Sequence, residues 1–540
     1  MNAAARGRRR AAPMLCSRKE RSRLETVQSS VLCQWLAPLW NALCRWYDAS
    51  VLARLIRGIG AGIRAWCDGS ALFHFAAREG TLTRAWPDSL LCRVLTFLLN
   101  IPTRLVQLIY EKCRTAFEGS FFAQLAFGIV ESTPLAVAWL MLVVMVIPFK
   151  YWNNAYSLAG FILCFILAIF AGTRQKGWKL DLAAIGPWLV AFAGMVMVSW
   201  PLSAYSSQSA RFLLYHVTCM LCVVVIVSTV ERRDQLVRLM GAASLALGVM
   251  SISGFYQRAN GIRINPSYVD MTLYKDMPGR VYAFYENPNT FAEVLLLLIP
   301  VAVALMLCSK GWFGRFLGFF SAALGCAAMI MTYSRASWLG LGVAVLVFLL
   351  LWKRKLIPAM IAVAVAALPF LPDVVFNRLI NMFNLSDSST SSRFPLYYAA
   401  GEFLMQRPLL GAGLGSDAVR SAISDLNLFH GIDHFVHCHN TYLQIWCETG
   451  LVGIISFVGG VLWTIKQGIR AVARSACHHQ TRLAIIGGAA ALAGSLVCGL
   501  ADYLWNYPRV MLIFWFVCAI VVAGIRLAAR EGKESTLCAE

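Results

Sequence analysis

Residues 289–308 read NTFAEVLLLLIPVAVALMLC, a run of 20 residues that contains a single charged side chain. At about 1.5 Å of rise per residue, a helix of this length spans the roughly 30 Å hydrocarbon core of a bilayer. Further apolar runs of similar length recur with short polar breaks between Ser132 and Leu527. We therefore predict an all-α, polytopic membrane protein with about twelve transmembrane helices.

The overall composition agrees with this class. Of the 540 residues, 59% are hydrophobic and only 14% are charged, and the mean hydropathy of +0.64 lies well outside the range of soluble globular proteins. The predicted spans comprise residues 132–149, 155–172, 182–200, 211–230, 236–256, 289–308, 314–332, 337–352, 355–371, 449–465, 483–501 and 510–527.

Lysine and arginine predict the orientation of these spans. The net charge is +21, and every short basic loop falls on one side when the first span is placed from inside to outside. Because basic loops stay in the cytoplasm, both termini are predicted there. No basic module with interleaved aromatic residues occurs, so we expect no nucleic-acid partner. The opposite side receives one long loop, residues 372–447, between the ninth and tenth spans.

The first 130 residues differ in kind and are predicted to form a separate extension. Apolar residues at helical spacing alternate with arginines, as in VLARLIRGIGAGIRAW (51–66), a pattern typical of basic amphipathic helices in the membrane interface. A small soluble helical domain and a partner-binding segment are the alternatives. No apolar signal-peptide core follows the basic start, and the 17 scattered cysteines imply no disulfide framework.

Ionisable residues gather at the predicted outer ends of the spans. Charges at such positions are costly unless they are paired or hydrated, so they are candidate functional groups. The candidates are Arg211, Arg280, Glu293 and Arg335. The alternative for each arginine is a side chain that reaches headgroup phosphates. Between Arg280 and Glu293, an Asn-Pro-Asn turn offers Asn289 as a helix cap.

Several polar candidate residues lie in the long outer loop. Half of the eight histidines lie there within ten residues, His430, His434, His437 and His439. Imidazole, thiolate and carboxylate are competent zinc ligands, so His434, His437, Cys438 and His439 with Asp433 form an alternative metal site. The spacing matches no strong zinc pattern. Earlier in the loop, a helix is predicted to begin near Ser392 and to include Arg393. The following GAGLG is not a dinucleotide fingerprint, because no strand precedes it.

Four motifs in order carry a resemblance to a known family. They are GRVYAFYENPN (279–289), MTYSRASWLGLG (331–342), RPLLGAGLGS (407–416) and HNTYLQIWCETGLVG (439–453). In order and sidedness they resemble the O-antigen ligase/polymerase family, polytopic glycosyltransferases of the bacterial inner membrane. The resemblance covers Pro134 to Leu527 and is most specific from Met331 to Gly453. It implies a ligase-like domain over residues 131–540, with 314–465 as its most family-like part.

The resemblance also implies a reaction and its residues. The family moves a glycan from a polyprenyl-diphosphate donor to a glycan or lipid acceptor, without a cofactor or a metal and with inversion. His439 is then the catalytic base, and Arg280 and Arg393 bind the diphosphate, supported by Arg335 and Arg211. The supporting pocket residues are Asn289, Glu293, Asn440, Tyr442 and Glu448. Membrane lipids are the remaining expected partners.

Two other functions fit part of the pattern. A transporter or flippase of lipid-linked glycans shares the helix number and the positive charge, but transporters usually contain internal repeats with broken helices, and the sequence has no comparable halves. A scaffold that recruits other enzymes through the N-terminal helices would not need His439.

Overall fold

The computed structural model describes residues 49–70, 78–175, 177–262, 279–383, 391–431, 435–474 and 477–537, with four isolated positions before residue 47. The chain divides into two compact units, residues 1–84 and 85–540. The predicted boundary at residue 130 stays a prediction, and the helices between residues 90 and 131 belong to the second unit.

The first unit contains the predicted basic helix, α3 (Val51–Gly69). Arg54 and Arg57 on this helix are exposed. A short helix, α5 (Thr81–Ala85), follows at the boundary between the units.

Every regular element described in the second unit is a helix. An N-terminal group consists of α6 (Leu90–Leu99), α7 (Ile101–Lys112), α8 (Arg114–Gly119) and α9 (Phe121–Glu131). The predicted spans correspond to α10 (Thr133–Val146), α11 (Asn154–Ala171), α12 (Leu182–Ile185), α13 (Pro187–Ser199), α14 (Ser206–Thr229), α15 (Arg233–Ala259), α16 (Pro288–Cys308), α17 (Trp312–Thr332), α18 (Arg335–Lys353), α19 (Ile357–Ala367), α24 (Thr441–Ala473), α25 (His479–Cys498) and α26 (Pro508–Leu537). Short 3₁₀ turns are η1 (Trp86–Asp88), η2 (Phe149–Tyr151), η4 (Arg354–Leu356), η5 (Leu368–Phe370), η6 (Asn381–Phe383) and η7 (Leu504–Asn506).

The all-α, polytopic architecture is confirmed. Within the described residues, nine helices are long and apolar enough to cross a membrane, or up to eleven if two bent pairs, α6 with α7 and α9 with α10, each count as one span. Two differences separate this number from twelve. Helix α13 has only 13 residues, and the predicted eighth and ninth spans form one apolar stretch over residues 335–370. The number twelve therefore stays a prediction.

Three helices form the centre of the bundle. In the most apolar 18-residue stretch of α16, α25 and α26, 83%, 78% and 89% of the residues are buried. This burial explains why residues 289–308 are apolar on every side of the helix. Close helix approach depends on small residues. A Cβ on Gly340 of α18 would lie 2.7 Å from the carbonyl oxygen of Gly494 of α25, so this pair lets the two backbones meet.

The N-terminal helices of the second unit dock on the loop that follows α11. The side-chain amide of Asn100 donates to the carbonyl of Leu180 at 3.1 Å and accepts from its N–H at 2.7 Å. The indole of Trp86 donates to the carbonyl of Leu182 at 3.3 Å. Apolar side chains such as Leu90 and Phe122 remain exposed on α6 and α9. Residues 90–131 therefore present apolar faces, as interfacial helices do, while α6 is anchored to the bundle.

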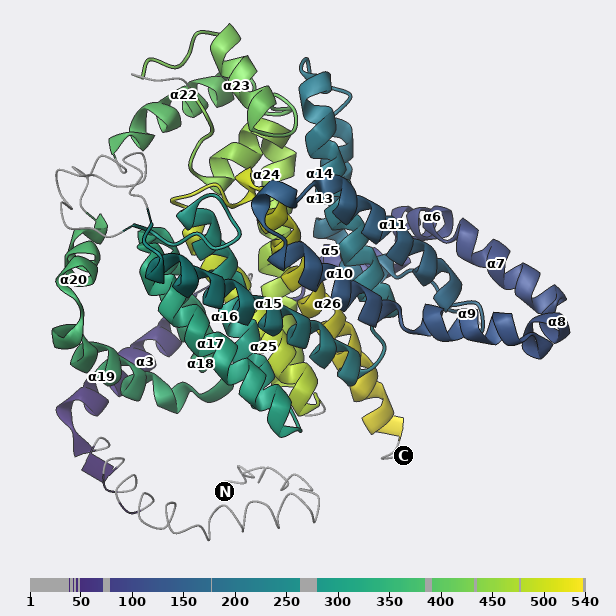
Figure 1. The fold of residues 1–540 in the computed structure, drawn as a ribbon, viewed down its shortest axis with the longest axis horizontal. Coiled ribbons are helices and arrows are strands. Elements are labelled where there is room, and N and C mark those ends of the chain that lie inside the picture. Colours follow the sequence, from purple (N-terminus) through teal and green to yellow (C-terminus); the bar gives the residue numbers. More distant parts are fainter. Residues whose placement is uncertain are drawn as a thin grey trace, which may run out of the picture. The chain divides into compact units, whose positions relative to one another are not determined.

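The long loop predicted at residues 372–447 is largely helical. It contains α20 (Asp373–Ile380), α22 (Arg393–Gln406) and α23 (Ser416–Asp425), and α22 and α23 lie at the end of the bundle where α24 begins (Figure 1). Helix α24 starts at Thr441, earlier than predicted, and bends at Gly450, whose φ is 72°. A Cβ there would lie 1.9 Å from the carbonyl oxygen of Leu409, so only glycine lets the loop pack against this bend.

Candidate functional site

His439 lies two residues before the start of α24 at Thr441. Its φ of 44° lies in the left-handed region that few non-glycine residues adopt. The next residue, Asn440, caps the helix, because its Oδ1 accepts from the N–H groups of Tyr442 and Leu443 at 2.9 and 3.0 Å. The strained backbone of His439 and the cap of Asn440 together hold the imidazole at the start of the helix, with 34% of its side chain exposed.

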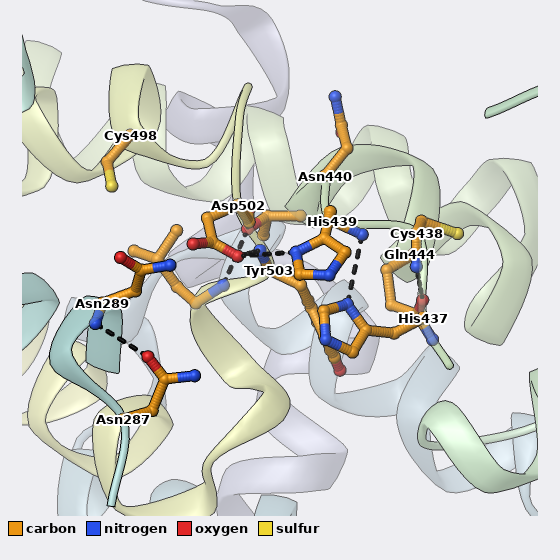
Figure 2. A network of polar contacts seen from close by, with 12 residues as sticks. Asn287, Asn289, His437, Cys438, His439, Asn440, Gln444, Cys498, Asp502 and Tyr503 are labelled. Carbon is orange, nitrogen blue, oxygen red and sulfur yellow. Dashed lines mark hydrogen bonds and ion pairs between the residues drawn. The ribbon is translucent and has the colours of Figure 1, made fainter. Parts of the chain in front are cut away.

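The partner of His439 is Asp502, in the loop between α25 and α26. The two side chains meet at 3.2 Å between Nδ1 of His439 and Oδ1 of Asp502 (Figure 2). The same carboxylate oxygen accepts the N–H of Tyr503 at 2.9 Å. Only 10% of the Asp502 side chain is exposed. A histidine oriented by a buried carboxylate is the arrangement that general bases use.

Backbone hydrogen bonds fix the two loops against each other. The N–H of Thr441 donates to the carbonyls of Gly499 and Asp502, at 2.8 and 3.0 Å. The side-chain amide of Asn440 donates to the carbonyl of Leu500 at 2.9 Å. Because these bonds join the start of α24 to the end of α25, the contact between His439 and Asp502 does not depend on flexible side chains alone.

Opposing effects set the charge of Asp502. Burial by itself raises the pKa of this carboxyl, but the hydrogen bond from His439 and the positive charges of His439 and Arg393 lower it. The net result is a pKa well below the usual range of an aspartate. Asp502 is therefore a carboxylate at neutral pH, and it can stabilise a positive charge on the imidazole.

His437 lies directly against His439. The ring centroids are 4.0 Å apart, and Nδ1 of His437 accepts the backbone N–H of His439 at 3.1 Å. Burial and the neighbouring charge of His439 lower the pKa of His437 to about 3. A neutral imidazole is required for this contact, since a protonated ring has no acceptor nitrogen. His437 therefore supports the strained backbone of His439 as an uncharged acceptor.

The lowered pKa of His437 predicts sensitivity to acid. The unfolded chain takes up a proton at its ordinary pKa near 6.5, whereas folded His437 resists until about pH 3. The stability due to neutral His437 is thus complete above pH 6.5 and is lost as the pH falls, by about 2 kcal/mol at pH 5. We expect His437→Phe to show a smaller drop in unfolding midpoint between pH 7 and pH 5 than the wild type.

Thermal unfolding of the purified protein in detergent measures this drop. His430→Phe is the matched control, since His430 is exposed in the same loop. An equal drop in the wild type and in His437→Phe would contradict the assignment.

A buried chain of side chains lies behind the two histidines. The amide of Gln444 accepts the N–H of Cys438 at 2.9 Å and donates to Glu448 at 2.9 Å. Glu448 also accepts the hydroxyl of Tyr503 at 2.8 Å. These contacts join the segment before α24 to the loop that carries Asp502. Glu448, predicted as a supporting residue, is 2% exposed and is linked to the segment before α24 through Gln444.

Arg280 is buried beside the turn between α17 and α18. Its Nε donates to the carbonyl of Thr332 at 2.7 Å, and its Nη2 donates to the side-chain oxygen of Asn289. The predicted cap was wrong in one detail. Asn287, not Asn289, caps α16, because its Oδ1 accepts the N–H of Asn289 at 2.8 Å. This leaves the oxygen of Asn289 to hold the guanidinium of Arg280.

Arg393 is the first residue of α22 and is half-buried. Its positive charge contributes to the lowered pKa values of Asp502 and His437, so it lies within electrostatic reach of the pair. One turn later, the hydroxyl of Tyr397 donates to the carbonyl of His439 at 3.4 Å. The structure therefore brings α22, predicted as a separate helix, to the His439 site.

Two other predicted arginines are held by different segments. Arg211 forms an ion pair with Asp417 of α23 at 2.9 Å, and Asp417 also binds Arg420 at 2.6 Å. Arg335 opens α18 and donates to the carbonyl of Asn381 at 2.9 Å. These two contacts thus come from other segments than those that hold His439.

The last two predicted residues lie in helices. Glu293 is 3% exposed in α16, one turn after Asn289. The hydroxyl of Tyr442 donates to the carbonyl of Leu496 in α25 at 2.5 Å. Tyr442 therefore ties α24 to α25, whereas Glu293 lies inside the bundle below the Asn-Pro-Asn turn.

The alternative metal site is only partly described. His434 and Asp433 lie outside the described residues, whereas His437 and His439 lie together and Cys438 is buried. In the described part of the chain, no three histidine, cysteine, aspartate or glutamate side chains gather as metal ligands do.

Sequence reasoning missed Asp502 and one further residue, Arg509. Arg509 is 2% exposed; it donates to the carbonyls of Phe284 and Ile147, at 2.7 and 2.5 Å, and lies 4.0 Å above the ring of Tyr285. It therefore fixes the segment between Arg280 and Asn287. Both missed residues occur in DYLWNYPR (502–509), where a charged residue stands at each end of a short polar break between apolar runs.

Membrane-length helices with a histidine–carboxylate pair at one end define a polytopic membrane protein with a site suited to acid–base chemistry. Residues 320–458 match the family model described as O-antigen ligase. This match to an O-antigen ligase domain confirms the resemblance over that segment, and it indicates an enzyme of the glycosyltransferase type. The match includes His439, Arg335 and Arg393, whereas Arg280 and Asp502 lie outside it. Comparison with curated proteins gives no match.

Proposed function

We propose that this protein transfers a glycan from a polyprenyl-diphosphate carrier to an acceptor hydroxyl, with inversion and without a metal. The observation that carries the proposal is the contact between His439 and Asp502. It occurs at one end of the membrane-length helices, and His439 lies in the segment that matches the O-antigen ligase family.

The geometry supports a role for each group in the reaction. Nδ1 of His439 faces Asp502, so the other ring nitrogen, Nε2, takes the proton of the acceptor hydroxyl. The acceptor oxygen then attacks the anomeric carbon as the bond from that carbon to the diphosphate oxygen breaks. A single displacement of this kind inverts the anomeric centre. The carboxylate of Asp502 stabilises the imidazolium that forms.

The departing diphosphate needs positive charge, which we assign to Arg280 and Arg393. Guanidinium groups bind phosphate oxygens through paired N–H donors. The buried contacts of Arg280 with Thr332 and Asn289 preorganise its side chain, and Arg393 lies near enough to His437 and Asp502 to act on their protonation. Arg211 and Arg335 are proposed to support donor binding at a greater distance from the reacting atoms.

We further propose that the site faces the outside of a bacterial inner membrane. Basic residues gather at the opposite end of the helices, where Arg233 pairs with Glu531 at 3.1 Å and Arg530 approaches Glu231 at 3.9 Å. The positive-inside rule places that end, and the C-terminus, in the cytoplasm. The protein would then bind the donor on the side of the membrane where lipid-linked glycans are polymerised or ligated.

The test of this function uses the purified full chain with a labelled polyprenyl-diphosphate glycan and an acceptor glycan or lipid. We expect labelled glycan to move to the acceptor with release of polyprenyl diphosphate, and we expect the rate to survive thorough chelation. Loss of activity on chelation would overturn the metal-free mechanism. Movement of the intact donor across vesicle membranes without transfer would replace the proposal with a flippase.

Replacing Arg280 by lysine keeps the positive charge of the side chain but removes its planar guanidinium group. Because one ammonium cannot reproduce the planar fork that meets Thr332, Asn289 and a diphosphate, we expect Arg280→Lys to lower kcat/KM about 10- to 100-fold. The same transfer assay measures it, at equal protein concentration. Arg258→Lys is the control, since Arg258 is an exposed arginine at the end of α15. Near-normal transfer by Arg280→Lys would contradict the paired contact with the diphosphate.

A further inference from the structure

A cavity lies apart from the residues around His439. It has a volume of about 480 Å³ and is bounded by α6, α12, α13, α14 and α26. Its walls are apolar, with side chains such as Leu98, Val190, Met197 and Val224, and they include His216. A volume of this size is typical of sites for small organic ligands.

The lining residues show that the cavity extends along α14. On α14 they recur at three- and four-residue intervals, at positions 216, 219, 220, 223 and 224, which is one stripe of a helix. From His216 to Val224 the stripe is about 12 Å long, and residues of α6 and α12 also line the cavity. A cavity of this form fits an extended hydrocarbon chain better than a compact ring system.

The cavity is continuous with the outer surface of the bundle. Leu98 and Met197 line it and are 54% and 47% exposed. Helix α14 is one of the helices long enough to cross a membrane, so an apolar opening beside it meets lipid rather than water. The ligand that has access to this opening is a hydrocarbon chain of the surrounding membrane.

His216 indicates which class of lipid the hydrocarbon chain belongs to. It is 4% exposed and meets Phe192 and Trp505 only through ring contacts, at 6.1 and 5.9 Å between centroids. In the described part of the chain, neither of its ring nitrogens makes a hydrogen bond. A buried polar group without a partner is costly. An isoprenoid chain offers only carbon and hydrogen, whereas an acyl lipid carries an ester carbonyl that accepts a hydrogen bond.

We propose that this cavity binds one acyl chain of a membrane glycerophospholipid, with an ester carbonyl of the lipid accepting a hydrogen bond from His216. Leu95, Leu98 and Leu99 of α6 form part of the wall of this cavity. The N-terminal helices thereby acquire a role, since α6 closes the lipid site. The inference is independent of the proposed transfer reaction, and its test does not use activity.

The experiment uses the full chain in vesicles that contain phosphatidylglycerol with a photoreactive diazirine in one acyl chain. After irradiation, peptides from α13 and α14 are analysed for covalent lipid. We expect Ala193→Trp, which fills the cavity, to lower labelling at least fivefold. Val198→Trp is the matched control, because Val198 is 44% exposed on the same helix and does not line the cavity. It should stay within twofold of the wild type.

Further variants and a second probe make the test decisive. Cys219→Phe is an independent filling variant that replaces Ala193→Trp if the latter does not purify as a folded protein. We expect His216→Phe to lower labelling two- to tenfold, and unchanged labelling would overturn the carbonyl contact. Equal labelling of the wild type and both filling variants would overturn the site. Stronger labelling by a polyprenyl phosphate that carries the same diazirine would overturn the acyl lipid as its occupant.

Discussion

Replacing His439 by alanine is expected to lower glycan transfer at least about 10³-fold, because the acceptor hydroxyl then lacks the group that takes its proton. The protein should still insert and fold, since the Asn440 cap and the backbone bonds of Thr441 do not involve the imidazole. Transfer by the purified variant, at equal concentration and with the same donor, measures the loss. In cells, short lipid-linked units should accumulate on the outer face while the mature product disappears.

His430→Ala is the matched control for this variant. His430 lies in the same loop and is exposed. Its removal therefore tests whether the loss of a histidine from this loop is by itself enough to lower transfer. We expect near-normal transfer from it. Transfer by His439→Ala within a few-fold of the wild type would show that His439 is not the base. Accumulation of donor on the inner face would instead indicate that the protein moves lipid-linked glycans.

Much of the fold could be predicted because membrane helices leave a direct signal. Long apolar runs must be helical in lipid, so the positions of α14, α15, α16 and α17 follow closely from composition. The errors occur where packing overrides length. Helix α13 ends after 13 residues, and α24 begins before its apolar run because Asn440 caps a polar first turn that leads to the bend at Gly450.

The candidate site was predictable in part, for a related reason. His439 and Arg280 stand in motifs whose neighbours are close in sequence. The partner of His439 is 63 residues away, and a single aspartate after an apolar run has the same appearance as a solvated loop residue. The folded chain makes it a partner because Thr441 binds the carbonyls of Gly499 and Asp502. Long-range hydrogen bonds of this kind leave no local pattern.

Replacing Asp502 by asparagine is expected to lower transfer about 10²- to 10⁴-fold, although the two side chains have nearly the same shape. The amide keeps an oxygen for the N–H of Tyr503, so the loop should remain folded. It loses the negative charge that orients His439 and stabilises the imidazolium during proton transfer. The effect should fall mainly on kcat, because Asp502 is not proposed to touch the donor or the acceptor.

The split between kcat and KM separates this role from a merely structural one. Loss of the charge should lower kcat in Asp502→Asn with little change in KM. A structural defect of the loop would also change KM and the unfolding midpoint. Thr464→Ser, a small change at a buried hydroxyl of α24 remote from this loop, is the control for general packing effects. An Asp502→Asn enzyme with unchanged kcat would mean that His439 does not need its carboxylate, and the acid–base pair would no longer explain the transfer.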